Sequence, residues 1–183
     1  MTYPAIAPTL ALGVVILVSV AVAETKLDSL AIAGRCCPAE AASCCAETVE
    51  NRQPLNCSLS FEKLLSASNC IQTAIYGARS MNIARIEDVE CCKVFDDDFN
   101  DEAGVCLSAC TRILRSPSIR SVDKLKSIKT CRPENKQFSC FRRCQSFRKS
   151  RKDPNEKFPY LAVCNLAARL KPGVLYIGPA LED

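Results

Sequence analysis

The residues of this chain best suited to chemistry are its 14 cysteines, four of which form two C-x-x-x-C pairs. These pairs are Cys106 with Cys110 and Cys140 with Cys144. A thiol–disulfide catalyst needs an exposed cysteine of low pKa beside a resolving partner, typically as C-x-x-C, and the sequence has no such pair. Residues four apart share one face of a helix, so we interpret both pairs as structural disulfide cysteines.

The order of the cysteines constrains their pairing only in part. Two antiparallel helices that carry the C-x-x-x-C pairs would be joined by bridges from Cys106 to Cys144 and from Cys110 to Cys140. An even count lets every cysteine pair, but order alone leaves the connectivity open. We expect each of the vicinal pairs at 36–37 and 44–45 to reach two different partners, because neighbouring side chains point in different directions. The predicted disulfide cysteines are Cys36, Cys37, Cys44, Cys45, Cys57, Cys70, Cys91, Cys92, Cys106, Cys110, Cys131, Cys140, Cys144 and Cys164.

The lack of histidine limits the enzymatic chemistry that this chain can perform. It excludes Ser-His-Asp and Cys-His sites, and also the His-Asp couple of the secreted phospholipases. A zinc site would need four suitably spaced thiolates in a reducing compartment, and the acidic residues 96–102 lack the central glycine of calcium loops. We expect no metal, no cofactor and no enzymatic activity. The alternative is a secreted enzyme that uses carboxylates of the 96–102 loop, since paired carboxylates cleave glycosides.

Basic residues are concentrated between positions 142 and 152 and form the candidate binding surface. Sulfated polysaccharides carry fixed anions, and each arginine or lysine that contacts one releases counterions. The alternatives are a solvated helix face that balances the acidic half of the chain, and a membrane-active cationic helix. Nucleic acid suits the same electrostatics, but the compartment inferred below argues against it. The candidate polyanion-binding residues are Arg142, Arg143, Arg148, Lys149, Arg151 and Lys152.

The N-terminal segment predicts export. Residues 6–23 are almost entirely apolar and end in Ala21-Val22-Ala23, with small residues where signal peptidase requires them. We predict a signal peptide over residues 1–23 and a secreted, extracellular, cysteine-rich domain over 24–183. Retention of the segment as an anchor is the alternative, because a helix of about 18 residues just spans a bilayer. No later apolar run is long enough, so we expect no stable membrane span after cleavage.

Asn56-Cys57-Ser58 matches the N-x-[ST] acceptor pattern, which makes Asn56 a candidate glycosylation site in an exported protein. Cysteine in the middle position is permitted but lowers the efficiency of the reaction. Early oxidation of Cys57 would block it.

Charge divides the predicted domain into two parts. Residues 24–102 hold 7 basic and 14 acidic residues, a net charge of −7. Residues 103–183 hold 17 basic and 6 acidic residues, a net charge of +11. Such asymmetry predicts either a partner of one sign or an internal match between the two parts.

Apolar periodicity predicts a mostly α, disulfide-rich fold with an irregular, cross-linked segment over 24–57. In the helix predicted from residue 60, Ser60 can cap the start, and Phe61, Leu64, Leu65 and Ile71 fall on one stripe. Cys70 lies off that stripe, so we expect it to bond to another segment. Helices are predicted over 60–79, 101–115, 119–130, 134–152 and 158–170, with a short edge strand over 174–177.

The order of six cysteines resembles that of the DB module, a cysteine-rich extracellular module best known from nematode proteins. The matching features are Cys91-Cys92, then the pair Cys106 and Cys110, then Cys131 and Cys140. The match rests on cysteine spacing over about a third of the chain. It departs from the module in two ways. The gap after Cys92 is longer, and the spaced pair Cys140 and Cys144 stands where the module has a second vicinal pair. The resemblance implies extracellular context and disulfide bonding and supplies no functional residues.

Together these observations predict a secreted, disulfide-stabilised protein that works by binding or as a structural component. Its expected partner is an unknown protein or a sulfated polysaccharide, and not a nucleic acid.

Overall fold

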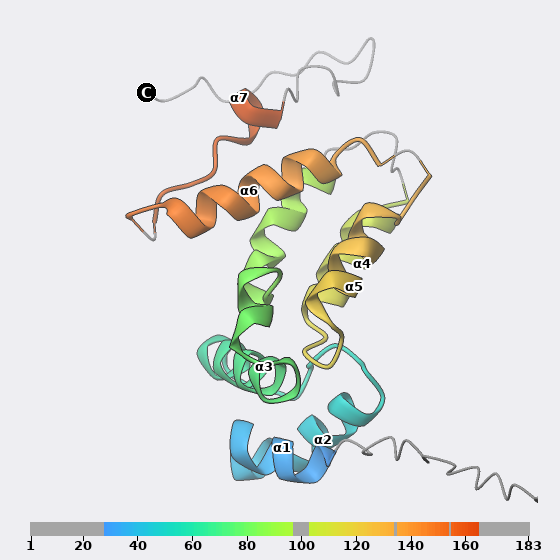
Figure 1. The fold of residues 1–183 in the computed structure, drawn as a ribbon, viewed down its shortest axis with the longest axis vertical. Coiled ribbons are helices and arrows are strands. Elements are labelled where there is room, and N and C mark those ends of the chain that lie inside the picture. The colour runs from blue at the N-terminus through green and yellow to red at the C-terminus, as the bar shows by residue number, and fades with distance from the viewer. Residues whose placement is uncertain (1–27, 97–102, 134, 154, 165–183) are drawn as a thin grey trace, which may run out of the picture.

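Helices are the only regular elements in the part of the chain that the computed structural model describes, residues 28–96, 103–133, 135–153 and 155–164 (Figure 1). This confirms the mostly α fold. The predicted strand at 174–177 and the predicted signal peptide lie outside the described residues. The elements are α1 (Ser29–Cys36), η1 (Ala39–Ala41), α2 (Ala42–Glu50), α3 (Phe61–Tyr76), η2 (Ala78–Asn82), η3 (Ile86–Phe95), α4 (Val105–Leu114), α5 (Ser121–Lys129), α6 (Phe138–Ser150) and α7 (Tyr160–Cys164), where η marks a 3₁₀ helix.

The N-terminal helices α1, α2 and α3 enclose a small aliphatic core. The segment predicted to be irregular is helical over most of its described length, which corrects that prediction. Helix α1 begins where the Asp28 carboxylate accepts a hydrogen bond from the Ala31 amide at 3.0 Å, a standard N-cap. Alanines between the cysteines favour helix and let α1 and α2 pack closely. This N-terminal core consists of Ile32, Ala33, Ala41, Cys45, Ala46, Val49, Leu55, Cys57, Ala67 and Ile71.

Helix α3 confirms the helix predicted from residue 60. The Ser60 hydroxyl accepts a hydrogen bond from the Lys63 amide at 3.5 Å. The helix ends at Gly77, whose φ of 75° suits glycine far better than any residue with a side chain. Ile71 is fully buried in the N-terminal core, so α3 directs its middle turns toward α1.

The ten-residue 3₁₀ helix η3 was not predicted, because its sequence repeats every three residues and not every 3.6. A 3₁₀ helix has three residues per turn, so residues three apart lie on one edge. Residues 86, 89, 92 and 95 form one inward edge, and residues 88, 91 and 94 form another. The third edge is polar and carries Glu87, Glu90 and Lys93.

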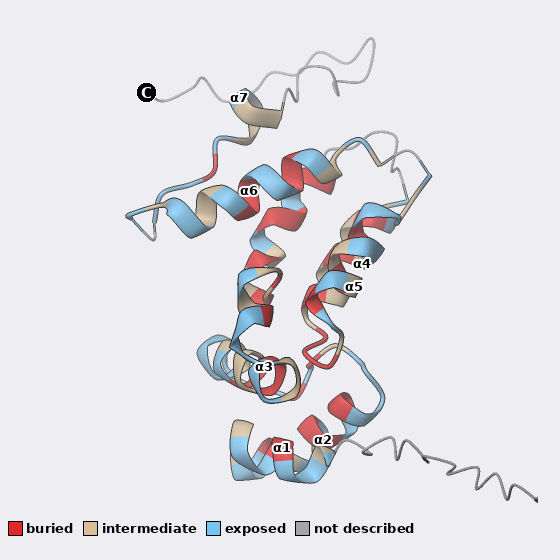
Figure 2. Ribbon diagram, viewed as in Figure 1, coloured by how far each residue is buried: buried red, intermediate tan, exposed pale blue. Residues whose placement is uncertain are grey.

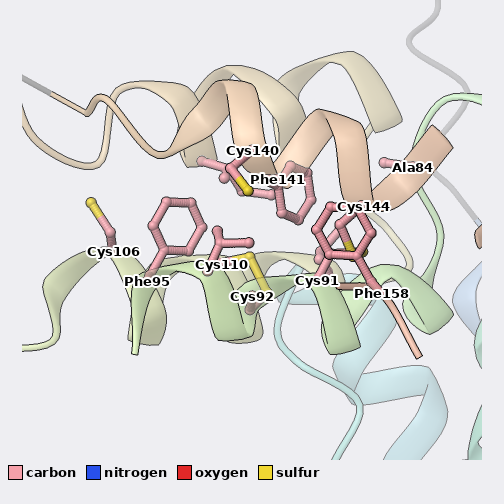
Figure 3. Packing of buried hydrophobic residues seen from close by; sticks show 13 residues of the cluster. Ala84, Cys91, Cys92, Phe95, Cys106, Cys110, Cys140, Phe141, Cys144 and Phe158 are labelled. Carbon is pink, nitrogen blue, oxygen red and sulfur yellow. A yellow bond between two sulfur atoms is a disulfide. The ribbon is translucent and has the colours of Figure 1, made fainter. Parts of the chain in front are cut away.

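The C-terminal core forms around η3. Helix α6 crosses η3. Helix α4 packs against η3, and α5 lies beside α4 (Figure 1). Buried positions on these helices face one another (Figure 2). Phe141 of α6 stacks on Phe95 of η3 with ring centroids 6.2 Å apart (Figure 3). This core consists of Ala84, Cys91, Cys92, Val94, Phe95, Cys106, Cys110, Leu114, Ile128, Cys140, Phe141, Cys144 and Phe158.

All 14 cysteines are paired in the structure, and no disulfide joins the two cores. The predicted bridges between α4 and α6 are wrong. Helix η3 lies between those helices, so Cys92 bonds to Cys110 of α4 and Cys91 bonds to Cys144 of α6 (Figure 3). The N-terminal bridges are 36–70, 37–45 and 44–57, and the C-terminal bridges are 91–144, 92–110, 106–131 and 140–164. Each vicinal pair therefore reaches two partners, as its geometry predicted.

Buried hydrogen bonds connect α3 to the C-terminal helices. Lys124 of α5 has no exposed surface, and its ammonium donates to Gln72 Oε1 at 2.6 Å. Gln72 Nε2 donates in turn to the Ala84 carbonyl at 2.7 Å. Burial lowers the pKa of Lys124 to about 8, although the Asp88 carboxylate opposes that shift. Hydrogen bonds thus connect the two cores to each other, whereas disulfides cross-link each core internally.

Candidate functional site

A groove lies where α3 meets η3, and we call it the junction groove. Its apolar wall consists of Phe61, Leu64 and Leu65 from α3 and of Ile86 and Val89 from the inward edge of η3. The groove encloses about 460 Å³. That volume falls within the range of about 300–1,000 Å³ typical of ligand pockets. The surface of the described chain is therefore hollowed at the junction between the two cores.

Part of this apolar wall is not needed to fill either core. Phe61 is 69% exposed, although an aromatic side chain gains much from burial. Leu65 is partly exposed and belongs to neither core, and Ile86 is buried yet also lies outside both. These three side chains form an apolar surface of their own along the groove.

The groove is rimmed by charged side chains, some of which are already paired. Glu87 faces Arg85 at 3.7 Å, and Glu90 pairs with Arg148 of α6. The Arg148 side chain is only 10% exposed, and burial lowers its pKa, with Arg151 acting in the same direction. Both acidic residues of the rim therefore already have cationic partners.

Two cations of the rim have no carboxylate partner among the described residues, Lys93 on η3 and Arg115 at the end of α4. Lys93 is exposed on the polar edge of η3. Arg115 uses Nη2 to bind the Leu55 carbonyl at 3.4 Å and Asn56 Oδ1 at 2.7 Å, both neutral acceptors. The unbalanced charge of the junction groove is therefore positive.

The predicted basic surface on α6 divides in the structure. Arg148 turns inward to the groove and is nearly buried, so its charge is not part of an outward face. Most of the others are exposed, although several of their heads bind acceptors within the chain. The contacts are Arg142 with Gln145 Oε1 at 2.5 Å, Arg143 with the Val163 carbonyl at 3.0 Å, Lys149 with the Asn82 carbonyl at 2.5 Å and Arg151 with the Glu156 carbonyl at 2.9 Å, whereas Lys152 is exposed.

Of the other two predicted sites, the glycosylation site is described in the structure and the acidic loop is described at one residue only. Asn56 is exposed next to Cys57, which is bonded to Cys44. Of the acidic loop only Asp96 is described, and residues 97–102 lie outside the described residues. Among the described residues, no three cysteine, aspartate or glutamate side chains come together in a way that could hold a metal ion. No helix of the described chain is long and apolar enough to cross a bilayer.

The junction groove was missed in the sequence because its residues were assigned to a core. Phe61, Leu64 and Leu65 do lie on the predicted stripe of α3, but only Leu64 of these three packs against the N-terminal core. The other wall required recognition of the three-residue repeat in Ile86–Phe95. That repeat is visible in the sequence as polar residues at 87, 90, 93 and 96.

Fold and groove together define a helical protein with two disulfide-bonded cores and a hollow between them. The family model for Caenorhabditis elegans Her-1 matches residues 25–168, so the chain belongs to the Her-1 family. Protein her-1 of Caenorhabditis elegans is 31% identical over 120 residues, which are 64% of this chain and 69% of that protein. The crystal structure of C. elegans HER-1 is similar with a TM-score of 0.59 at 29% identity, covering 68% of this chain and 90% of that one.

The resemblance to the DB module is wrong. The family match includes the N-terminal core, whereas the cysteine order compared with the DB module begins only at Cys91. Cysteine spacing over a third of the chain therefore did not identify the family. Family membership and seven disulfides are consistent with a secreted protein.

Proposed function

We propose that this chain is a secreted protein that acts by binding another protein at the junction groove, and not by catalysis. The observation that carries the proposal is Phe61, which is 69% exposed at the edge of an apolar hollow. Aromatic side chains, including phenylalanine, and arginine are enriched in protein interfaces relative to the rest of the surface. Phe61, Arg115 and Arg148 all line this groove.

The rigidity of the surrounding scaffold supports the same function. Disulfides hold each core, so the walls of the groove are preorganised and lose little conformational entropy when a partner binds. Bridge 36–70 fixes α3 to α1, and bridge 91–144 fixes η3 to α6. A groove between two rigid units is also a common place for a ligand to bind.

Site-specific photo-crosslinking tests this proposal. A benzophenone amino acid replaces Phe61 in one variant and Val122, an apolar α5 residue that is 53% exposed, in the matched control. Each variant is irradiated with cell-surface and extracellular proteins of the organism that encodes the chain. We expect a discrete adduct from position 61 alone, which excess wild-type protein suppresses and Leu65→Asp does not. Equal adducts from both positions, or equal suppression by Leu65→Asp, would contradict the proposal.

A second candidate function is polyanion binding, supported by the exposed cations that remain on and after α6. Arg142, Arg143, Lys149 and Lys152 are exposed, and Arg151 is half-buried. On heparin, we expect the triple variant Arg142→Gln, Arg143→Gln, Lys152→Gln to elute at clearly lower salt than wild type. Arg148→Gln should elute unchanged because its head is buried. The control triple Arg112→Gln, Lys126→Gln, Lys129→Gln removes the same charge elsewhere, and an equal shift there would reduce the effect to net charge.

We further propose that residues 1–23 are removed on export and that Asn56 is glycosylated in part. Sequencing of the secreted product should begin at Glu24. Treatment with an amidase that removes N-glycans should shift the mass of wild type and leave Asn56→Gln unchanged. The variant Cys44→Ala keeps the Asn56-Cys57-Ser58 acceptor and should carry more glycan, because the 44–57 bridge no longer competes for that segment.

A further inference from the structure

Resting on the proposed function, we infer that the junction groove recognises a segment of a partner protein in which an apolar side chain lies next to a carboxylate. The apolar wall formed by Leu65, Ile86 and Phe61 receives the apolar side chain. The two rim cations without carboxylate partners, Lys93 and Arg115, receive the carboxylate.

The charge of the groove carries the first half of this inference. Five charged residues line it, three basic and two acidic. Arg85 and Arg148 already pair with the two acidic ones. Lys93 and Arg115 would repel a basic group of a partner, and among the described residues that line the groove no unpaired carboxylate offsets that repulsion. A carboxylate, in contrast, forms charge-assisted hydrogen bonds with either cation, and these are roughly twice as strong as neutral ones.

Arg115 is prepared for such a contact. Its Nη2 atom is held by the Leu55 carbonyl and by Asn56 Oδ1, so the plane of the guanidinium is fixed. Nη1 makes no hydrogen bond among the described residues, and Nε is buried without a partner. A fixed guanidinium with unused donors loses little entropy when it binds an acceptor.

The apolar wall carries the second half. A groove of about 460 Å³ between two helices accommodates the side chains of one helical or extended segment. Phe61 and Leu65 are one helical turn apart on α3 and face Ile86 and Val89 of η3. Covering Phe61 and Leu65 would remove from water apolar surface that neither core covers, and such burial is the main source of affinity in apolar grooves.

Selection from a phage-displayed library of random 12-residue peptides tests the inference. The full secreted protein is the target, and Leu65→Asp is used for counter-selection. We expect enriched peptides to carry Leu, Ile, Phe or Met within three residues of Asp or Glu. Synthetic peptides are then compared in matched pairs, with each Asp or Glu replaced by Asn or Gln. The carboxylate form should bind about tenfold more tightly to wild type at low salt.

Charge variants locate the carboxylate on the protein. Lys93→Gln and Arg115→Gln should each reduce the difference between the paired peptides, because each removes one cation of the rim. Lys126→Gln and Arg112→Gln remove an exposed cation from α5 and α4 outside the groove and should leave that difference unchanged. The Lys93 side chain makes no hydrogen bond or ion pair with the described residues, so its variant remains informative even if Arg115→Gln disturbs the Leu55 segment.

The outcomes separate the inference from the proposed function. Peptides that require Leu65 but bind equally as carboxylates and amides would overturn the inference and leave the groove as a binding site. Peptides that bind Leu65→Asp as well as wild type, or no enrichment, would overturn both. Concentration-dependent dimerisation that Leu65→Asp abolishes would make a second copy of the chain the occupant and would also overturn the inference.

Discussion

The two cores of this protein use different means to hold short helices together. The N-terminal core contains no aromatic residue and closes disulfide loops with sequence separations of 34, 8 and 13. The C-terminal core contains Phe95, Phe141 and Phe158, and its separations are 53, 18, 25 and 24. Small side chains permit close packing of α1 and α2, whereas the larger C-terminal core needs aromatic rings to fill the space around η3.

This difference explains why the exposed aromatic residue lies at the junction. Phe61 belongs to the N-terminal helices, whose core has no aromatic partner for it. It lines the junction groove together with Ile86 and Val89 of η3 and belongs to neither core. Because Phe61 packs in neither core, its ring is available to a binding partner. The groove that it lines lies between the cores for the same reason, since apolar side chains there are not covered by either core.

The largest expected contrast is between two phenylalanines. Phe141→Ala should lower the free energy of unfolding by about 3–5 kcal/mol, because it removes a fully buried ring stacked on Phe95 and leaves a cavity. Phe61→Ala should change it by no more than about 0.5 kcal/mol, since that ring is mostly exposed. Denaturant unfolding monitored by circular dichroism measures both. A loss of several kcal/mol from Phe61→Ala would show that this ring stabilises the fold and would break the contrast.

Removing one bridge from each core should give the next largest difference. By loop length alone, the 91–144 bridge should contribute about 4 kcal/mol and the 37–45 bridge about 2.5 kcal/mol. The double variants Cys91→Ala, Cys144→Ala and Cys37→Ala, Cys45→Ala avoid leaving free thiols. Their unfolding midpoints in guanidinium should differ accordingly. The reverse order would indicate that native packing around each bridge, and not chain entropy, dominates the comparison.

The third contrast concerns the polar hydrogen bonds at the junction and depends on pH. The pKa of Lys124 is lowered to about 8 in the folded protein, whereas a free lysine has a pKa near 10.4. Between these values the unfolded chain binds the proton that the folded chain has released, so stability should rise with pH from about 8 to about 10. The slope contributed by Lys124 is at most about 1.4 kcal/mol per pH unit. Lys124→Met should lack this contribution, and identical pH profiles for both proteins would refute the assignment.

Several elements could be predicted because their signals are local. The Ser60 cap and the apolar residues that follow it predicted α3, and apolar periodicity predicted a helix over 101–115, where α4 carries Cys106 and Cys110. Helix η3 was not predicted, because its apolar residues repeat every three positions, whereas an α-helix repeats every 3.6 and a strand every two. The α1–α2 segment was expected to be irregular because its cysteine density masked an alanine-rich helical composition.

The sequence by itself determined that the cysteines would be cross-linked and that the fold would be helical, since both follow from composition and local periodicity. Only the tertiary structure decided which cysteines pair. Helix η3 lies between α4 and α6, so its vicinal cysteines form the disulfides with Cys110 and Cys144. It also decided that Arg148 turns inward and that Phe61 stays outside. Such outcomes depend on which surfaces meet, and that is fixed by packing between segments far apart in the chain.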